Sequence, residues 1–282
     1  MAGNRSEEER RGEILITPRG RWPKPRLREV AGSLGLLRFM VFRDVKVRYS
    51  QTLFGVSWAL IQPLATMVIF WAVFSKLMGV RSEAVSYPLF ALAGITIWNL
   101  FSQGMTAATA SLVSRQEQIT KIYFPRLLIP LSAIAVALVD FAIGAALVII
   151  VALATGASIG PAILLAPVFV MMAVAVATGV GAALGALNVF YRDVRYLVGF
   201  LVQLWMFATP VAYPSTLIPE HLRWVAGLNP MSGIVEGFRW SLLGTPAPDP
   251  TLLALSALTG LLALVGGVLL FAALEDRFAD LI

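Results

Sequence analysis

A single carboxylate lies deep inside one of the long apolar runs of this sequence. Asp140 falls near the middle of the run from Leu127 to Thr155. An ionised carboxylate at the centre of a membrane helix costs on the order of 2.5 to 3.5 kcal/mol, so this side chain must face protein or water. A proton relay would need a partner, and we identify no intramembrane Lys, Arg, His or second carboxylate for it. We therefore expect Asp140 to have a structural, hydrogen-bonding role.

Amide and aromatic side chains are also distributed through the apolar runs. Sugars bind proteins by stacking on aromatic faces and by hydrogen bonding to amides, so these residues could line a passage for a saccharide. Tryptophan belts at membrane interfaces and amide bonds between helices give the same pattern, and the residues alone leave both interpretations open. They are Gln62, Asn99, Gln103, Gln203, Trp58, Trp71, Trp98, Phe101 and Trp205.

The composition indicates a membrane environment. Of the 282 residues, 58% are hydrophobic and 13% are charged, whereas soluble domains carry about 25% charged residues. A helix needs about 20 mostly apolar residues to span the hydrocarbon. We predict an all-α polytopic membrane protein with six transmembrane helices, over residues 55–78, 88–113, 127–155, 161–188, 197–213 and 252–274. The fifth run is short and contains Pro210, so we expect it to kink or to end early.

The distribution of basic residues predicts the orientation. Twelve of the 22 Lys and Arg residues precede the first apolar run. With the N-terminus in the cytoplasm, 18 fall on that side of the membrane and four on the other, in agreement with the positive-inside rule. We predict that both termini are cytoplasmic, that residues 1–28 form a flexible basic tail and that residues 29–282 form one transmembrane domain. A basic segment beside an anionic membrane surface requires no nucleic acid as a partner.

Several kinds of catalytic site are absent from the sequence. It has no cysteine and one histidine, so we expect neither thiol chemistry nor a metal centre. No phosphate-binding loop of the form G-x-x-x-x-G-K-[ST] occurs, and no Ser/His/Asp set is present. We expect a protein that is not an enzyme by itself and that binds no cofactor.

The segment from Leu34 to Tyr49 mixes apolar positions with charges. We expect it to lie along the membrane surface as a helix. On a helical wheel Arg43 and Lys46 cluster, whereas Arg38 and Arg48 fall nearer the apolar stripe and would have to snorkel. The pattern leaves open whether this helix only anchors the chain or forms a gate.

Two polar connections face the cytoplasm in this topology. The first, SRQEQITKIYFPR from Ser114 to Arg126, suits a helix that docks a soluble partner and equally suits a solvated turn. The second, YRDVRY, contains an interfacial charge cluster. Here Arg192 and Asp193 could pair with Arg43 and Asp44, which would tie the N-terminal helix to the bundle.

Residues 214–250 are too hydrophobic for an ordinary loop. Long segments without secondary structure are uncommon, and Asn229 followed by Pro230 is typical of a helix start. Glu236 and Arg239 have the spacing of an ion pair on that helix. We predict two short re-entrant helices that dip into the outer leaflet before the last span.

Six patches of the sequence, in order from about Leu34 to Gly244, resemble the polysaccharide-export branch of the type-two ABC exporter permeases. Any one patch would be weak evidence, whereas six in the same order are specific. They are RDVKVRYSQTLFGVSWALIQP (43–63), YPLFALAGITIWNLFSQG (87–104), KIYFPRLLIPLS (121–132), NVFYRDVRY (188–196), TPVAYP (209–214) and LNPMSGIVEGFR (228–239).

The resemblance implies a homodimer bound to two copies of a separate ATP-binding subunit, which carries the ATP and Mg²⁺. The implied substrate is a lipid-linked, undecaprenyl-type polysaccharide such as O antigen, capsule or teichoic acid. It would be moved across the bacterial cytoplasmic (inner) membrane, whose lipids surround the protein. Two alternatives remain open: a small-molecule or drug exporter of the same superfamily, and a membrane-embedded glycosyl or phosphoglycosyl transferase.

The resemblance also implies roles for particular residues. A gate helix and its contacts comprise Arg43, Asp44, Lys46, Arg48, Tyr49, Arg192 and Asp193. A coupling helix that receives the ATPase stroke comprises Ser114, Arg115, Gln116, Glu117, Gln118, Ile119, Thr120, Lys121 and Tyr123. The re-entrant helices contain Pro214, Asn229, Pro230, Glu236 and Arg239. Candidate channel-lining residues are Trp58, Gln62, Phe70, Trp71, Phe74, Trp98, Asn99 and Phe101.

Overall fold

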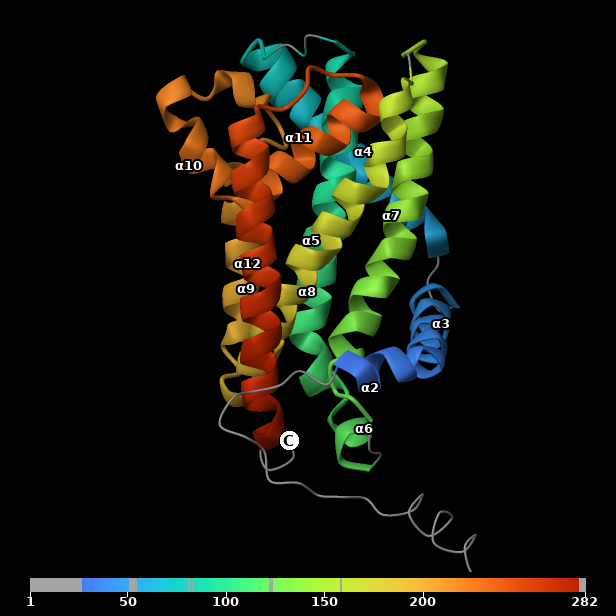
Figure 1. Cartoon of the computed structure of the whole chain (residues 1–282). Coiled ribbons are helices and arrows are strands. Elements are labelled where there is room, and N and C mark those ends of the chain that lie inside the picture. The colour runs from blue at the N-terminus through green and yellow to red at the C-terminus, as the bar shows by residue number, and fades with distance from the viewer. Residues whose placement is uncertain are drawn as a thin grey trace, which may run out of the picture.

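The computed structural model describes residues 27–50, 55–80, 82, 84–121, 124–157 and 159–278. All regular elements in these ranges are helical, as the apolar runs predict. The predicted tail, residues 1–28, lies outside the described residues except for its last two, which begin α2 (Leu27–Gly32). The next helix, α3 (Leu34–Ser50), lies beside one end of the bundle (Figure 1).

The long helices follow the predicted runs closely. They are α4 (Trp58–Phe70), α5 (Tyr87–Ser114), α7 (Leu128–Ala154), α8 (Ala166–Phe190), α9 (Val194–Ala208) and α12 (Pro250–Leu274). Three of them have short extensions: the π-helix η2 (Trp71–Leu77) continues α4, the 3-10 turn η3 (Pro161–Leu165) precedes α8, and η6 (Glu275–Arg277) follows α12. A 3-10 turn, η1 (Gly55–Ser57), precedes α4. Within the described ranges, four helices are long and apolar enough to cross a membrane: Trp58–Leu77, Leu128–Ala154, Pro161–Phe190 and Pro250–Arg277.

Two of the six predicted spans, α5 and α9, are not among these four helices. α5 has 28 residues and forms the centre of the bundle, packed against α7 and α8 and buried along most of its length. α9 has 15 residues and ends at Ala208, before Pro210, as the short fifth run predicts. At a rise of 1.5 Å per residue, α9 is about 22 Å long, which is less than the roughly 30 Å of a hydrocarbon core.

Small residues allow the helices to approach closely. A Cβ atom on Gly179 of α8 would overlap the Ala263 carbonyl of α12, and one on Gly267 would overlap the Gly179 carbonyl. Gly181 faces Ala108 and Met105 of α5 in the same way. Helices that pack in lipid commonly use such small residues at their crossings. α8 therefore lies in close contact with both α5 and α12, and α7 packs against α5 while α11 packs against α12, α8 and α5.

Short helices cap the two ends of the bundle. α6 (Gln116–Lys121) lies at the same end as α2 and α3 (Figure 1). At the opposite end are the turns η4 (Ser215–Leu217) and η5 (Glu220–Leu222), then α10 (Arg223–Gly227) and α11 (Pro230–Leu243). Asn229 caps α11 by accepting a hydrogen bond of 3.0 Å from the Met231 N–H, which confirms the helix start predicted from Asn229 and Pro230.

Candidate functional site: a polar cavity beside α3

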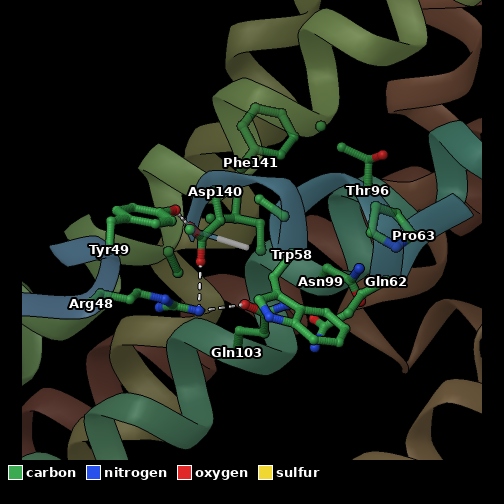
Figure 2. Close-up of a pocket in the computed structure, with 15 residues that line it drawn as sticks. Arg48, Tyr49, Trp58, Gln62, Pro63, Thr96, Asn99, Gln103, Asp140 and Phe141 are labelled. Atoms are coloured by element: carbon green, nitrogen blue, oxygen red, sulfur yellow. Dashed lines mark hydrogen bonds and ion pairs between the residues drawn. The ribbon is translucent and has the colours of Figure 1, made fainter. Parts of the chain in front are cut away.

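A polar cavity of about 190 Å³ lies where the end of α3 meets α4, α5 and α7. Small residues such as Ala59, Ala137 and Gly144 leave the space that the cavity occupies. Figure 2 shows Arg48, Tyr49 and Asp140 on one side of this space, and Trp58, Gln62 and Asn99 on the other. The charged side comes from α3 and α7, and the amide and aromatic side from α4 and α5.

The Asp140 carboxylate has two partners from α3, which corrects the prediction that it has no charged partner. The Arg48 guanidinium lies 2.7 Å from Asp140 Oδ2, and the Tyr49 hydroxyl donates a hydrogen bond to Asp140 Oδ1 (Figure 2). Arg48 also donates to Gln103 Oε1 of α5 at 3.3 Å. Arg48 therefore turns inward and joins α3 to α5 and α7, whereas the helical wheel alone predicts snorkelling.

Tyr49 is suited to remain a hydrogen-bond donor. Burial, and next the hydrogen bond to Asp140, raise the pKa of Tyr49 to about 12. Both effects disfavour the phenolate, because burial penalises charge and a neighbouring carboxylate repels a second anion. At neutral pH the phenol is protonated and the Tyr49–Asp140 bond is retained.

The amide and aromatic side of the cavity has the chemistry of a saccharide contact. Trp58 is 46% exposed, and Gln62, one helical turn further along α4, is also exposed. Asn99 and Gln103 face the same cavity from α5. An indole face beside several amides offers stacking together with paired donors and acceptors.

The remaining predicted lining residues divide into two groups. Trp98 and Phe101 are buried inside the bundle, where the Phe101 ring meets Trp98 at a tilt and Trp205 edge-on, with ring centroids 5.3 and 4.9 Å apart. Phe70 is buried and packs edge-on against Phe74 at 5.6 Å. Trp71 is 38% exposed, and Phe74 is half-buried.

A second charged contact joins α3 to the bundle. Asp44 accepts hydrogen bonds from Arg115, the residue between α5 and α6, and from the neighbouring Arg43. Arg115 also donates to Ser132 Oγ of α7 at 2.7 Å. Burial lowers the pKa of Arg115, although the Asp44 carboxylate opposes that shift.

These contacts correct the predicted partners of Arg43 and Asp44. Arg192 and Asp193 are exposed at the start of α9, and Asp44 pairs with Arg115 instead. Arg192 lines a separate hollow with Ser114 and Asn188, where the ends of α5 and α8 meet. Lys46 is exposed on α3. Of the residues predicted to form a gate helix, Asp44, Arg48 and Tyr49 therefore contact α5 and α7. The sequence spacing does not indicate Arg115 as a partner of Asp44.

Of the predicted coupling residues, Gln116–Lys121 form the short helix α6. Gln116 and Glu117 are exposed at its start, Gln118 is half-buried, and Ile119, Thr120 and Lys121 complete it. Ser114 ends α5, and its hydroxyl donates to the Ser111 carbonyl at 3.0 Å. Tyr123 lies outside the described residues. The structure therefore supports a helix in this connection rather than a turn.

At the other end of the bundle, Arg239 is the largest fully buried side chain, 1% exposed. Its guanidinium donates to the backbone carbonyls of Phe90, at 3.0 Å, Pro210, at 2.7 Å, and Val211, and lies over the Phe90 ring. The predicted pairing with Glu236 is corrected, because Glu236 accepts a hydrogen bond from the Ser215 N–H. Arg239 thus binds α11 to α5 and to the chain after α9.

Asn229 strengthens the same junction. Its amide oxygen also accepts a hydrogen bond from the Trp205 indole at 2.8 Å, and its amide nitrogen donates to Thr209 Oγ1 at 2.9 Å. Pro230 is buried at the first position of α11, and Pro214 immediately precedes η4. The residues assigned to the re-entrant helices therefore form one hydrogen-bonded junction around the end of α9.

We predict that the Arg48–Asp140 contact stabilises the chain as a coupled unit. Asp140→Asn should lower the free energy of unfolding by about 1 to 2 kcal/mol, since Arg48 is partly exposed and can return to solvent. Arg48→Gln should cost a similar amount. The double variant with Arg48→Gln and Asp140→Asn should be little less stable than either single variant, because both changes remove the same contact.

Thermal unfolding in detergent measures this cycle. The matched control is Arg38→Gln, which removes an exposed charge from the same helix and should change stability by less than about 0.5 kcal/mol. If the costs of Arg48→Gln and Asp140→Asn simply add, the two residues do not act through a shared contact.

Comparison with known proteins places this architecture in a family. Residues 35–243 match the model of the ABC-2 type transporter family. The chain is 28% identical over 256 residues to the O-antigen export system permease protein RfbA of Myxococcus xanthus, an alignment that covers 90% of this chain and 98% of that protein. It is 27% identical over 248 residues to the protein of the same name from Klebsiella pneumoniae, covering 88% and 95%. The matched region contains the polar cavity, α6 and the Arg239 junction, and the chain belongs to the ABC-2 type transporter family.

Proposed function

We propose that this chain is the membrane-spanning subunit of an ATP-driven exporter that moves O antigen, as a lipid-linked polysaccharide, across the bacterial inner membrane. The observation that carries the proposal is similarity along almost the whole chain to O-antigen export permeases, with 98% of the Myxococcus xanthus protein covered. The helices long and apolar enough to cross a membrane agree with it.

The proposed topology has six spans. In chain order they are α4 with η2, α5, α7, η3 with α8, α9 and α12. The short helix α9 would complete its crossing through the residues that follow Ala208. An even number of spans places both termini on one side, and the basic residues favour the cytoplasm. α10 and α11 would be the re-entrant pair in the outer leaflet, held by Arg239 and Asn229.

The proposed assembly is a homodimer with two copies of an ATP-binding subunit. ATP and Mg²⁺ would be bound by that partner, because this sequence has no phosphate-binding loop. α6 lies at the same end of the bundle as α2 (Figure 1), and this exposed position at one end of the bundle supports contact with a soluble partner. Closure of the ATPase pair can drive export only if it favours one arrangement of the two membrane subunits over another.

The proposed saccharide contacts are aromatic and amide side chains that line the cavity, together with Trp71, which is exposed further along the same helical run. Trp58, Gln62 and Trp71 lie on α4 and η2, and Asn99 contributes from α5. Trp98 and Phe101 would support this face from inside the bundle rather than touch the substrate. A second copy would close the passage opposite α4.

Depletion of the chain in cells tests the substrate. We expect lipid-linked O-antigen polysaccharide to accumulate on the cytoplasmic side of the membrane, because its synthesis continues while export stops. Fractionation and lipopolysaccharide gels measure it, with a strain complemented by the wild-type gene as the control. Unchanged surface O antigen would refute the proposed substrate and leave a small-molecule exporter as the alternative.

A charge reversal in α6 tests the coupling role. Glu117→Arg combined with Gln118→Glu should reduce transport-stimulated ATP hydrolysis at least about tenfold while membrane insertion persists, since docking depends on complementary charge. Hydrolysis by the complex in reconstituted vesicles measures it. Glu220→Arg, an exposed reversal at the opposite end, should leave hydrolysis unchanged. Normal coupling in the α6 variant would contradict the assignment.

A further inference from the structure

Arg115 occupies the joint between α5 and α6. Its backbone, with φ −120° and ψ 26°, leaves the α-helical conformation, and its N–H still bonds to the Leu112 carbonyl at the end of α5. The next residue, Gln116, begins α6. A rotation of α6 relative to α5 must therefore change the backbone at Arg115, because this is where the two helices connect.

The side chain at this joint reaches two further helices, α7 and α3. One guanidinium nitrogen of Arg115 donates to Ser132 of α7 and the other to Asp44 of α3. The Arg115 and Asp44 side chains are 14% and 18% exposed, so salt and water screen this ion pair weakly. A planar guanidinium with two fixed partners transmits a change of position better than a flexible ammonium would.

Asp44 lies on the face of α3 that contacts the bundle. Met40 is buried one turn before it, and Arg48 binds Asp140 one turn after it. The opposite face exposes Phe39 and Phe42. α3 is thus attached by two charged contacts, one to the start of α6 and one to α7. Arg43 is the other charged group that contacts Asp44, from within the same helix.

We propose that Asp44 and Arg115 form the direct link through which movement of α6 displaces α3, and that both are positioning residues for export. This proposal rests on the proposed function, in which α6 receives the ATPase stroke. When α6 rotates, the Arg115 guanidinium moves with the joint and carries Asp44 with it. The Arg48–Asp140 contact holds the following turn of α3, so α3 swings about that contact.

The variants separate this link from general loosening of α3. Asp44→Asn and Arg115→Gln each remove one charge of the pair, and the exchange of Asp44→Arg with Arg115→Asp restores opposite charges in reversed order. Arg38→Gln is the matched control, because that side chain is exposed on the same helix. Each variant is purified with its ATPase subunit, and copurification and the unfolding temperature confirm assembly and folding.

Movement of α3 is measured by spin labels. The chain has no cysteine, so Val47→Cys on α3 and Tyr196→Cys on α9, both exposed, can be labelled selectively. The labelled chain is mixed with an excess of unlabelled chain, so that most complexes contain one labelled copy. The complexes are assembled with an ATPase subunit that has no cysteine. The distance between the labels is compared without nucleotide and with ADP and vanadate.

We expect the label distance to shift with nucleotide in the wild type and in Arg38→Gln. The shift should disappear in Asp44→Asn and in Arg115→Gln, and surface O antigen should fall about tenfold. The exchanged pair should recover at least half of the shift. A purely structural role would lower the unfolding temperature without removing a nucleotide-dependent shift.

Two results would overturn the proposal. One is a shift that persists in both single variants; the other is a folded, assembled exchange variant that moves no more than they do. Failure of the proposed function looks different, because then the wild-type chain copurifies with no ATPase subunit or its depletion leaves O antigen unchanged.

Discussion

Replacing Arg239 by methionine is expected to reduce accumulation of the folded protein strongly and to lower its unfolding temperature. The guanidinium supplies donors to the Phe90, Pro210 and Val211 carbonyls at the junction of α5, α9 and α11. A buried carbonyl without a donor costs about 1 to 3 kcal/mol, and methionine offers no donor. Relief of a buried charge offsets part of that loss. A net cost of about 3 to 5 kcal/mol would remove much of the 5 to 15 kcal/mol that stabilises a typical domain.

Yield of monodisperse protein and thermal unfolding in detergent measure this effect. Arg239→Lys should be nearly as damaging, because an ammonium lacks the planar fork that reaches three carbonyls. Arg223→Met is the matched control at the same end of the molecule, where the arginine is partly exposed and lies 3.8 Å from Glu220. Full stability of Arg239→Met would show that water or the neighbouring backbone can replace the guanidinium.

Adding one methyl group at Gly267 should separate α8 from α12. A Cβ atom there would overlap the Gly179 carbonyl, which is backbone and cannot rotate away. Overpacking typically costs 1 to 3 kcal/mol and costs more where only a helix shift relieves it, so we expect Gly267→Ala to lose about 3 kcal/mol. Thermal unfolding in detergent should show a lower transition temperature.

The neighbouring residue provides the control. Gly266→Ala adds the same methyl group to the same helix, where nothing lies within 4 Å, and should be neutral or slightly stabilising because alanine favours helix. Equal effects of the two substitutions would mean that helix propensity, rather than the close crossing of α8 and α12, determines the response.

The sequence predicts the helices well because length and interruption define them. Residues 88–113 were expected to span, and α5 runs from Tyr87 to Ser114. Proline and glycine mark such limits by local chemistry. The sequence does not predict which face of a helix is covered, because positions that face lipid and positions that face protein are both apolar. Trp98 and Phe101 were expected to line a channel for this reason, and the structure buries them in the bundle.

The charged contacts were the least predictable part of the site. Asp140 and Arg48 lie far apart in the chain, and nothing in their local sequence indicates that α3 packs on α7. The spacing of Met40, Asp44 and Arg48, one helical turn apart, was available as a signal for the face that contacts the bundle. A helical wheel based on hydrophobicity alone assigns Arg48 to the membrane surface.

The order of charges on α3 restricts how that helix can travel. Asp44 faces an arginine and Arg48 faces an aspartate. If α3 slid along its axis by one turn, about 5.4 Å, either Arg48 would replace Asp44 opposite Arg115, or Asp44 would replace Arg48 opposite Asp140. Both shifted registers oppose like charges, which is unfavourable at short range. Tilting or lifting away from the bundle avoids this repulsion, so lateral opening is the permitted direction of motion for α3.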